Sequence, residues 1–264
     1  KEQRRLLPIA EGGDEQTEAK QSQGRTEDRG EVSLPDGTTY AGQWLGEVRH
    51  GLGVLTRPSG ATYRGQFEHS RAHGYGTLRE VDGSIYSGYW VSDCKHGHGK
   101  YVHPDGTVYE GDWAGDCKCG AGIESWADGT RYEGEFLKGC KHGMGNYKAV
   151  GGVKYMGQFV GDNMDGEGIY TFSGGRAYSG QWVGGHMNGR GKMTFPDGSW
   201  YEGGYIMDLK HGEGMFRWND GRYYKGEWQK GKQHGAGVMI DVKGLQSHGE
   251  WNNGALIHWL NKDV

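Results

Sequence analysis

The sequence lacks long apolar runs and is poor in leucine, isoleucine and valine, although aromatic residues make up 12% of its 264 residues. No stretch approaches the roughly 18 consecutive apolar residues that a membrane-spanning helix needs. A conventional two-layer aliphatic core is therefore not expected. An excess of positive charge is also missing, because 30 Lys and Arg stand against 34 Asp and Glu, for a net charge of −4. This balance argues against a general nucleic-acid-binding protein.

The aromatic residues follow a strict period. Nine tyrosines are spaced 23 residues apart, with a glycine two residues after each and a second ring four residues after each. The tyrosines are Tyr40, Tyr63, Tyr86, Tyr109, Tyr132, Tyr155, Tyr178, Tyr201 and Tyr224. The second rings are Trp44, Phe67, Trp90, Trp113, Phe136, Phe159, Trp182, Tyr205, Trp228 and, in a partial tenth copy, Trp251. A period without insertions predicts one structural unit repeated along the chain, which excludes most enzyme folds.

Each unit also contains a Gly-x-Gly pair and a turn glycine, as in Tyr109-Glu-Gly-Asp-Trp113, Gly120-Ala-Gly122 and Asp128-Gly129. This pattern resembles the membrane occupation and recognition nexus (MORN) repeat over about residues 30–254, with nine full copies and two partial ends. The resemblance implies a fold and a mode of interaction, because members of the family are found in lipid kinases, junctional membrane proteins, ciliary spokes and the cortical cytoskeleton.

Within each unit the residues alternate with a period of two, which predicts strands with one packed and one polar face. Asp-Gly pairs such as Asp105-Gly106 predict two-residue hairpin turns with positive φ at both residues. A six-residue turn is expected between Trp44 and Gly51. Mid-strand glycines are expected to make room for rings that lie over neighbouring strands. The predicted fold is all-β, an elongated single-layer antiparallel β-meander of tandem 23-residue hairpins, roughly 90 Å long.

The two ends of the chain depart from the repeat. The high charge of residues 1–29 predicts a disordered tail or a short helix. Its apolar residues Leu6, Leu7 and Ile9 are expected to be either part of a linker or a docking peptide. Residues 30–254 form the predicted repeat array. Residues 255–264 begin with the apolar segment Ala255-Leu-Ile-His-Trp-Leu260, which is expected to cap the last hairpin or to contact a partner or a second copy.

Histidine and cysteine recur at fixed repeat positions. Six histidines stand before the first glycine of Gly-x-Gly, and a turn role in left-handed backbone is the preferred explanation: His50, His73, His96, His142, His211 and His234. Cys94, Cys117 and Cys140 share another position, two residues before His96, Cys119 and His142. Reduced thiols are the default expectation in a cytosolic protein. The alternatives are a zinc site built from these six residues and lipid attachment to the cysteines.

Two candidate binding surfaces follow from the pattern. An aromatic groove is predicted from rings on the packed face, namely Trp113, Trp126, Phe172, Trp182, Phe195, Trp218 and Trp228. A basic edge is predicted from the turns after the second ring, namely Arg49, Arg71, Lys95, Lys118, Lys141, Lys210, Lys230 and Lys232. The opposite turns carry aspartates, which have a turn-forming role already.

The sequence contains no pair of carboxylates and no nucleophile that stands apart from the repeat, so no catalytic activity and no cofactor are predicted. The leading hypothesis is a cytoplasmic scaffold that holds a partner helix or peptide in its groove, within a cytoskeletal, ciliary or cortical assembly. One alternative is a peripheral membrane adaptor that binds anionic phospholipid through the basic edge. Another is the repeat module of a larger enzyme, since Lys1 leaves an upstream region open. A homodimer is a further option.

Overall fold

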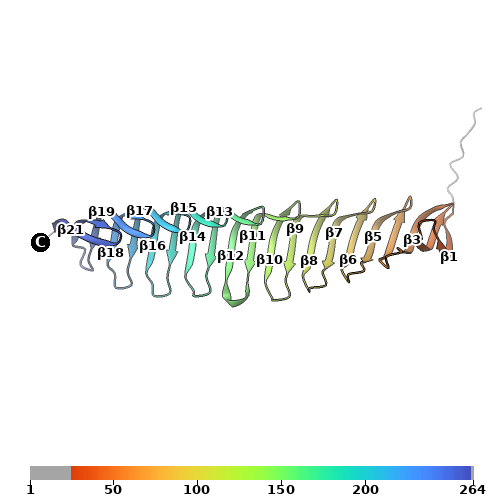
Figure 1. Cartoon of the computed structure of the whole chain (residues 1–264), viewed down its shortest axis with the longest axis horizontal. Helices are drawn as coiled ribbons and strands as arrows, with labels where there is room; N and C mark the ends of the chain where they lie inside the picture. The colour runs from red at the N-terminus through yellow and green to blue at the C-terminus, as the bar shows by residue number, and fades with distance from the viewer. Residues whose placement is uncertain (1–24, 263–264) are drawn as a thin grey trace, which may run out of the picture.

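The computed structural model describes residues 25–262, which form one antiparallel sheet of 21 strands. Each strand pairs with its neighbours along the chain, from the pairing of β1 with β2 to that of β20 with β21. The sheet is a continuous ribbon with the first and last strands at opposite ends (Figure 1). The predicted all-β, single-layer meander is confirmed. No helix in the described part of the chain has the length and apolar character that a membrane crossing requires.

Strands of seven and nine residues alternate from β2 to β20, so each repeat contributes one of each. The elements are β1 (Glu27–Ser33), β2 (Thr39–Leu45), β3 (Val48–Thr56), β4 (Thr62–Glu68), β5 (Arg71–Arg79), β6 (Ile85–Val91), β7 (Cys94–Val102), β8 (Val108–Ala114), β9 (Cys117–Ser125), β10 (Arg131–Leu137), β11 (Cys140–Lys148), the 3-10 turn η1 (Val150–Gly152), β12 (Lys154–Val160), β13 (Asn163–Thr171), β14 (Ala177–Val183), β15 (His186–Thr194), β16 (Trp200–Ile206), β17 (Leu209–Arg217), β18 (Tyr223–Gln229), β19 (Lys232–Ile240), β20 (Gln246–Asn252) and β21 (Ala255–Lys262).

The Asp-Gly turns differ from the prediction. In the first of them, the Gly37 N–H donates to the Leu34 carbonyl at 3.0 Å and the Leu34 N–H donates to the Thr38 carbonyl at 2.8 Å. This is a three-residue loop in which Gly37 has φ 81° and Asp36 does not have positive φ. The Asp36 carboxylate accepts the Thr38 N–H at 3.0 Å, which holds the aspartate in its turn conformation. The expected two-residue turn with two left-handed residues is therefore wrong at this edge.

The two-residue turns lie at the other edge, where a six-residue turn was expected. The strand after Trp44 already begins at Val48. In most copies both turn residues are left-handed, as in Ser92 (φ 49°) and Asp93 (φ 71°), which is the hairpin turn that matches strand twist. Each such turn also bonds to the preceding repeat: the Asp93 N–H donates to the Ala72 carbonyl at 3.0 Å. The Asp93 carboxylate accepts the Ala72 N–H at 2.7 Å, so adjacent repeats are tied together at this edge.

A bulge in the nine-residue strands explains the first glycine of each Gly-x-Gly pair. Gly42 pairs with Gly53 and Trp44 pairs with Arg49, so one residue of β2 faces three residues of β3. Gly51 lies in this bulge with φ 72°. The Gln43 side chain fills the gap and accepts the Leu52 N–H at 2.8 Å.

The predicted left-handed histidines are therefore wrong. The glycine that follows each of the six histidines has the positive φ, whereas none of the six does.

The tyrosines form a buried ladder along one face, here called the aromatic face. Every tyrosine of the period is at most 4% exposed. Tyr178, for example, contacts Trp182 of its own repeat and Tyr205 of the next, both at 5.1 Å between ring centroids and nearly perpendicular. The same edge-to-face contacts run from Tyr40 to Trp251. Such pairs contribute about 0.5–1.5 kcal/mol each beyond area burial. The ladder is therefore the core of the single-layer sheet formed by residues 25–262.

A row of glycines crosses the sheet beside the ladder. Gly134 faces Gly122 on β9 and Gly145 on β11, and the row continues in both directions. A Cβ atom on Gly145 would lie 2.5 Å from the Tyr132 ring, so the ring occupies the place of a side chain. This confirms the predicted role for Gly53, Gly145 and their counterparts, whereas a Cβ atom on Gly42 would first meet the Leu52 carbonyl oxygen at 2.4 Å and the Gly53 Cα at 2.5 Å. Gly51 differs from both, because a Cβ there would meet the Gln43 side chain at 2.1 Å.

Burial of the ladder predicts that the protein loses stability in alkali. Burial raises the pKa of Tyr132, Tyr155, Tyr178 and Tyr224 to about 12, from an ordinary value of 10.0. The folded state therefore favours neutral phenol, and its stabilisation is complete below pH 10 and is lost as the pH rises toward 12. We expect the melting temperature to fall across this window, with a smaller fall in Tyr178→Phe. An unchanged melting temperature up to pH 12 would contradict this account.

Both ends continue the sheet. Strand β1 begins at Glu27, three residues before the predicted start of the array, and residues 1–24, with Leu6, Leu7 and Ile9, lie outside the described residues. The apolar tail forms β21, which pairs with β20, and its Trp259 meets Trp251 edge-to-face at 5.9 Å. The tail thus adds a strand to the end of the ribbon. Its contact with a partner or a second copy stays a prediction.

Candidate functional site

The aromatic face carries a second set of rings outside the ladder. These rings lie at the ends of the nine-residue strands and in the Asp-Gly turns, and they are partly buried against the ladder: Tyr101, Trp126, Tyr147, Tyr170, Phe172, Phe195, Phe216 and Trp218. Tyr170 and Phe172 lie 4.6 Å apart between ring centroids, and Phe216 and Trp218 lie 4.9 Å apart. The outer rings therefore widen the apolar strip and leave part of it open to solvent.

All seven rings predicted to line a groove lie on this face, but they fall into two classes. Trp113, Trp182 and Trp228 belong to the buried ladder and are 4–7% exposed. Trp126, Phe172, Phe195 and Trp218 are outer rings, packed against the ladder and only partly buried. The ladder rings form the floor, so a partner would meet mainly the outer rings.

A groove is present over the later repeats. Its floor and walls include Met164, Phe172, Trp182, Met187, Phe195 and Leu209, and we call it the apolar groove. A second hollow continues from it over Phe216, Trp218 and Trp228. Lys210 lines both hollows. Five of the seven predicted rings line these two hollows, whereas Trp113 and Trp126 lie on the same face over earlier repeats.

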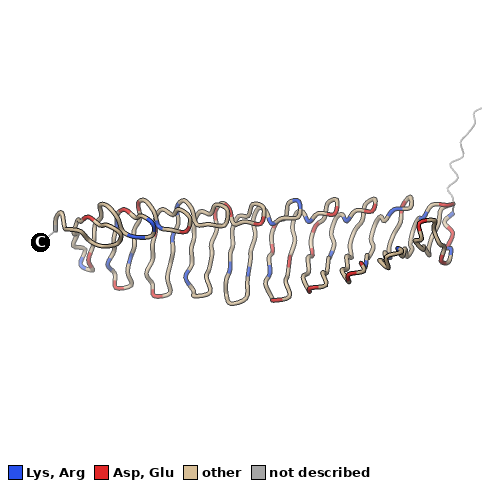
Figure 2. The backbone as a smooth tube through the Cα atoms, viewed as in Figure 1, with Lys and Arg blue, Asp and Glu red and all other residues tan. Residues whose placement is uncertain are grey.

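The predicted basic edge is not one surface. Five of its residues pair with the second ring of each repeat, on the aromatic face, and we call them the cation column: Arg49, Lys95, Lys118, Lys141 and Lys210. Their charges lie over rings, as Lys118 does over Tyr109 at 4.8 Å. Arg71 and Lys232 are exposed strand-end residues, and Lys230 is a turn residue. Aspartates occupy the same turns, so this edge carries both signs of charge (Figure 2).

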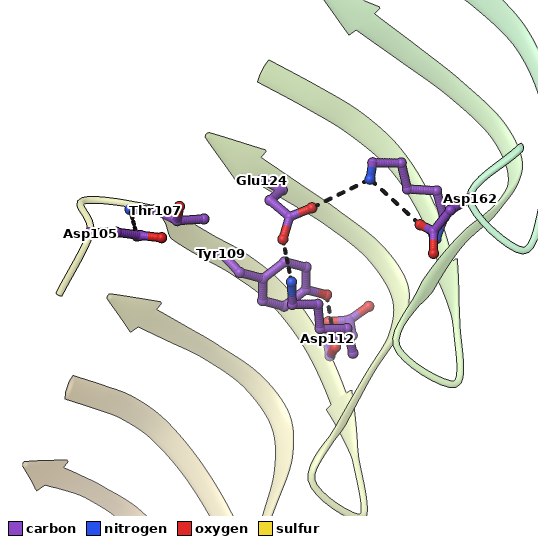
Figure 3. Close-up of polar contacts among 8 residues, drawn as sticks. Asp105, Thr107, Tyr109, Asp112, Glu124 and Asp162 are labelled. Carbon is purple, nitrogen blue, oxygen red and sulfur yellow. Dashed lines mark hydrogen bonds and ion pairs between the residues drawn. The ribbon is translucent and has the colours of Figure 1, made fainter. Parts of the chain in front are cut away.

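Carboxylates neutralise the middle of the cation column. Glu124, only 8% exposed, forms an ion pair with Lys118 and a second with Lys141 at 3.7 Å (Figure 3). Lys141 also pairs with Asp162 of the next turn at 3.5 Å. Lys95 lies 4.0 Å from Asp116, the corresponding aspartate two repeats earlier. Burying the Glu124 carboxylate without a cationic partner would cost free energy of folding, so its ion pairs with Lys118 and Lys141 offset that cost.

The cysteines and histidines do not form a metal site. Within residues 25–262, no group of three or more His, Cys, Asp or Glu side chains is arranged to hold a metal ion. All four cysteines are free thiols. The Asp116 carboxylate raises the pKa of the Cys94 thiol, and Asp162 raises that of Cys140, so both thiols favour the protonated form. The predicted zinc ligands Cys94, His96, Cys117, Cys119, Cys140 and His142 are thus spread along the edge instead of being brought together.

Sequence reasoning missed two features of this site. One is the role of Glu124, which occupies a position that holds Leu55, Tyr101 or Met193 in other repeats. The other is that Met164 and Met187 replace a cationic residue at the column position of two repeats, which makes the apolar groove continuous. Aligning the repeats at 23-residue spacing would have revealed both substitutions, although not their contacts.

Comparison with solved structures finds similar chains at low identity. The wild-type TCP10 domain of Danio rerio CPAP is 12% identical, with 75% of this chain and 93% of that chain covered and a TM-score of 0.41. The Drosophila melanogaster SAS-4 TCP domain in complex with a proline-rich motif of Ana2 is 10% identical, with coverages of 94% and 99% and a TM-score of 0.24. Virginiamycin B lyase from Staphylococcus aureus is 11% identical, with coverages of 86% and 71% and a TM-score of 0.16. At these TM-scores none of the three indicates a function.

Comparison with curated proteins finds no match. The family model for the MORN repeat matches nine consecutive segments, at residues 40–62, 63–85, 86–108, 109–131, 132–153, 155–175, 178–200, 201–221 and 224–246. These segments cover most of the sheet, and each starts at a ladder tyrosine. The chain therefore belongs to the MORN repeat family.

Proposed function

We propose that this protein is a non-catalytic scaffold that holds a segment of a partner protein in its apolar groove. The observation that carries the proposal is the partial exposure of the outer rings over a fully buried ladder. Aromatic side chains on a rigid surface are favoured at protein interfaces, because they bury a large area at little entropic cost. A cytoskeletal, ciliary or cortical setting is part of the same proposal, since it follows from where such repeats are found.

The rigidity of the sheet supports a scaffold. Each repeat is fixed to the next by the strand ladder, by the tyrosine contacts and by the turn bonds at one edge. A partner segment would therefore meet a preformed groove, which lowers the entropic cost of binding. In the middle repeats the Glu124 carboxylate is shared by Lys118 and Lys141, so it serves as an ion-pair partner in the structure of the aromatic face.

A display selection of short peptides against the whole chain tests the proposal. We expect the selected peptides to lose at least about tenfold in affinity when Phe195 or Trp218 is replaced by serine, a loss of about 1.4 kcal/mol. Tyr89→Ser is the matched control, because Tyr89 is a ring on the opposite, polar face and is 53% exposed. Binders that are equally sensitive to all three variants, or only to Tyr89→Ser, would overturn the proposal.

The alternative is a membrane adaptor that binds anionic phospholipid. Fewer cations are free for it than the sequence indicated, since Lys95, Lys118 and Lys141 already have carboxylate partners. Flotation with phosphoinositide-containing liposomes at physiological salt separates the two functions. Salt-sensitive flotation that persists in Trp218→Ser would replace the scaffold proposal by the adaptor.

A further inference from the structure

Lys210 differs from the other lysines of the cation column in having no carboxylate partner among the described residues. Its ammonium nitrogen lies 4.7 Å from the Tyr201 ring, 4.5 Å from Phe216 and 4.6 Å from Trp228, measured to the ring centroids. Within residues 25–262 its amine makes no ion pair or hydrogen bond, whereas Lys95, Lys118 and Lys141 each have a carboxylate within 4.0 Å. In the part of the chain that the structure describes, the side-chain contacts of the Lys210 ammonium are thus with aromatic faces.

In other repeats, carboxylates at two positions pair with the lysines of the cation column, and both positions hold a different residue in the repeat of Lys210. The turn residue that faces each column position lies 21 residues later, and it is Asp116 for Lys95 and Asp162 for Lys141. For Lys210 it is Gly231, whose N–H donates to the Lys210 carbonyl at 2.9 Å. The strand position that supplies Glu124 beside Lys118 is Phe216 beside Lys210. Neither replacement has a side chain with a carboxylate or any other oxygen that could accept a hydrogen bond from the Lys210 ammonium.

The other charged side chains that line the apolar groove do not neutralise Lys210. Asp208 also lines the groove, but its carboxylate accepts the Met187 N–H at 2.8 Å and contacts His186 Nδ1 at 2.7 Å. Arg176 also lines the groove, and its guanidinium lies over the Phe172 ring at 4.1 Å from the centroid. The groove is therefore apolar with an excess of positive charge. Burial lowers the pKa of the Lys210 ammonium to about 8, so it still carries its charge at neutral pH.

We infer that the partner segment is an apolar peptide with one acidic side chain, and that the carboxylate of this side chain pairs with Lys210. The inference rests on the proposed function and specifies the chemistry of its partner. Lys210 lies where the two hollows meet, so a segment that fills both must cross it. A neutral segment would cover the ammonium without replacing its water, which costs binding energy. An acidic residue at that point would replace the water and would select the register of the segment.

A double-mutant cycle tests the pair. The probes are the tightest peptide from the display selection and the same peptide with its acidic residue changed to the matching amide. The protein variant is Lys210→Met, which places at this position the residue that Met164 and Met187 provide in two other repeats. We expect Lys210→Met to weaken the acidic peptide at least tenfold and to change the affinity of the amide peptide by less than threefold. Lys225→Met, on the polar face, removes the same charge and is expected to change neither.

The outcomes separate the inference from the proposed function. Equal losses for the two peptides in Lys210→Met, or selected peptides without a shared acidic position, would overturn the inference while the scaffold proposal stands. Binding that survives Trp218→Ser would overturn both. A second readout does not depend on affinity: in NMR titrations, the pKa of the Lys210 ammonium is expected to rise when the acidic peptide binds and not when the amide peptide binds. A rise with both peptides, or with neither, contradicts the pairing.

Discussion

Replacing Gly134 by valine is expected to unfold the middle of the ribbon, with a loss of about 3 kcal/mol or more. A Cβ atom on Gly134 would lie 2.6 Å from the Gly145 Cα, the Met144 carbonyl oxygen and the Tyr132 hydroxyl. Two of these three atoms belong to the backbone of the paired strand, so they cannot move aside without breaking the ladder of hydrogen bonds. The stability is measured by thermal and denaturant unfolding monitored by circular dichroism.

The matched control for this prediction is Glu133→Val. Glu133 is the neighbouring residue on the exposed polar face, and its contact with Arg131 at 2.9 Å is a surface ion pair of little energetic value. Valine also suits a strand well, so the control is expected to change stability by less than about 0.5 kcal/mol. Equal melting temperatures for the two variants would contradict the view that the glycine row makes room for the paired strand and the tyrosine side chain. Hydrogen exchange should rise mainly in β9–β12, because repeats contact only their neighbours.

Removal of one ladder ring is the second large effect. Tyr178→Ala is expected to cost about 3–5 kcal/mol, because it deletes a fully buried ring and leaves a cavity between two repeats. Tyr178 is 0% exposed and contacts both Trp182 and Tyr205. Its removal would therefore break the ring contacts between two neighbouring repeats. For a chain of this size the melting temperature should fall by about 10 °C.

Two further variants separate the causes of that loss. Tyr178→Phe keeps the ring and removes only the hydroxyl, which donates to the Gln181 carbonyl at 3.0 Å, so it should cost about 1 kcal/mol. Tyr75→Ala removes a ring of the same size from the polar face, where it is 53% exposed. If Tyr75→Ala were as damaging as Tyr178→Ala, ring burial in the ladder would not be the main source of stability.

The fold was predictable because its main determinants are local and periodic. The tyrosine, the mid-strand glycine and the second ring fix which face is packed, and their spacing fixes two strands per repeat. The turns were assigned to the wrong edges because Asp-Gly fits both a two-residue turn and the end of a three-residue loop, and both place glycine at positive φ. The choice depends on the bulge at Gly51, which the sequence does not reveal locally.

The candidate site was only partly predictable for a related reason. Arg49 and Lys95 were placed in turns, whereas the short turns leave them inside strands on the aromatic face. The pairing of Lys141 with Asp162 depends on a turn bonding to the preceding repeat, a contact that spans 21 residues instead of the 23 of the period. An alignment of the repeats at 23-residue spacing therefore does not show this contact. The environment of Lys210 becomes visible only once this contact is known.

The direction of the strands has a mechanical consequence for any protein built in this way. Antiparallel hydrogen bonds run perpendicular to the strands, and here the strands stack along the long axis of the ribbon (Figure 1). Tension between the two ends would therefore pull along the hydrogen bonds and open them in sequence from a terminal strand inward. The ribbon would open one strand at a time. The force needed for each step would depend on the pairing of the terminal strand and not on the length of the array. A tether of this kind would yield gradually and re-form from the remaining strands when the load is removed.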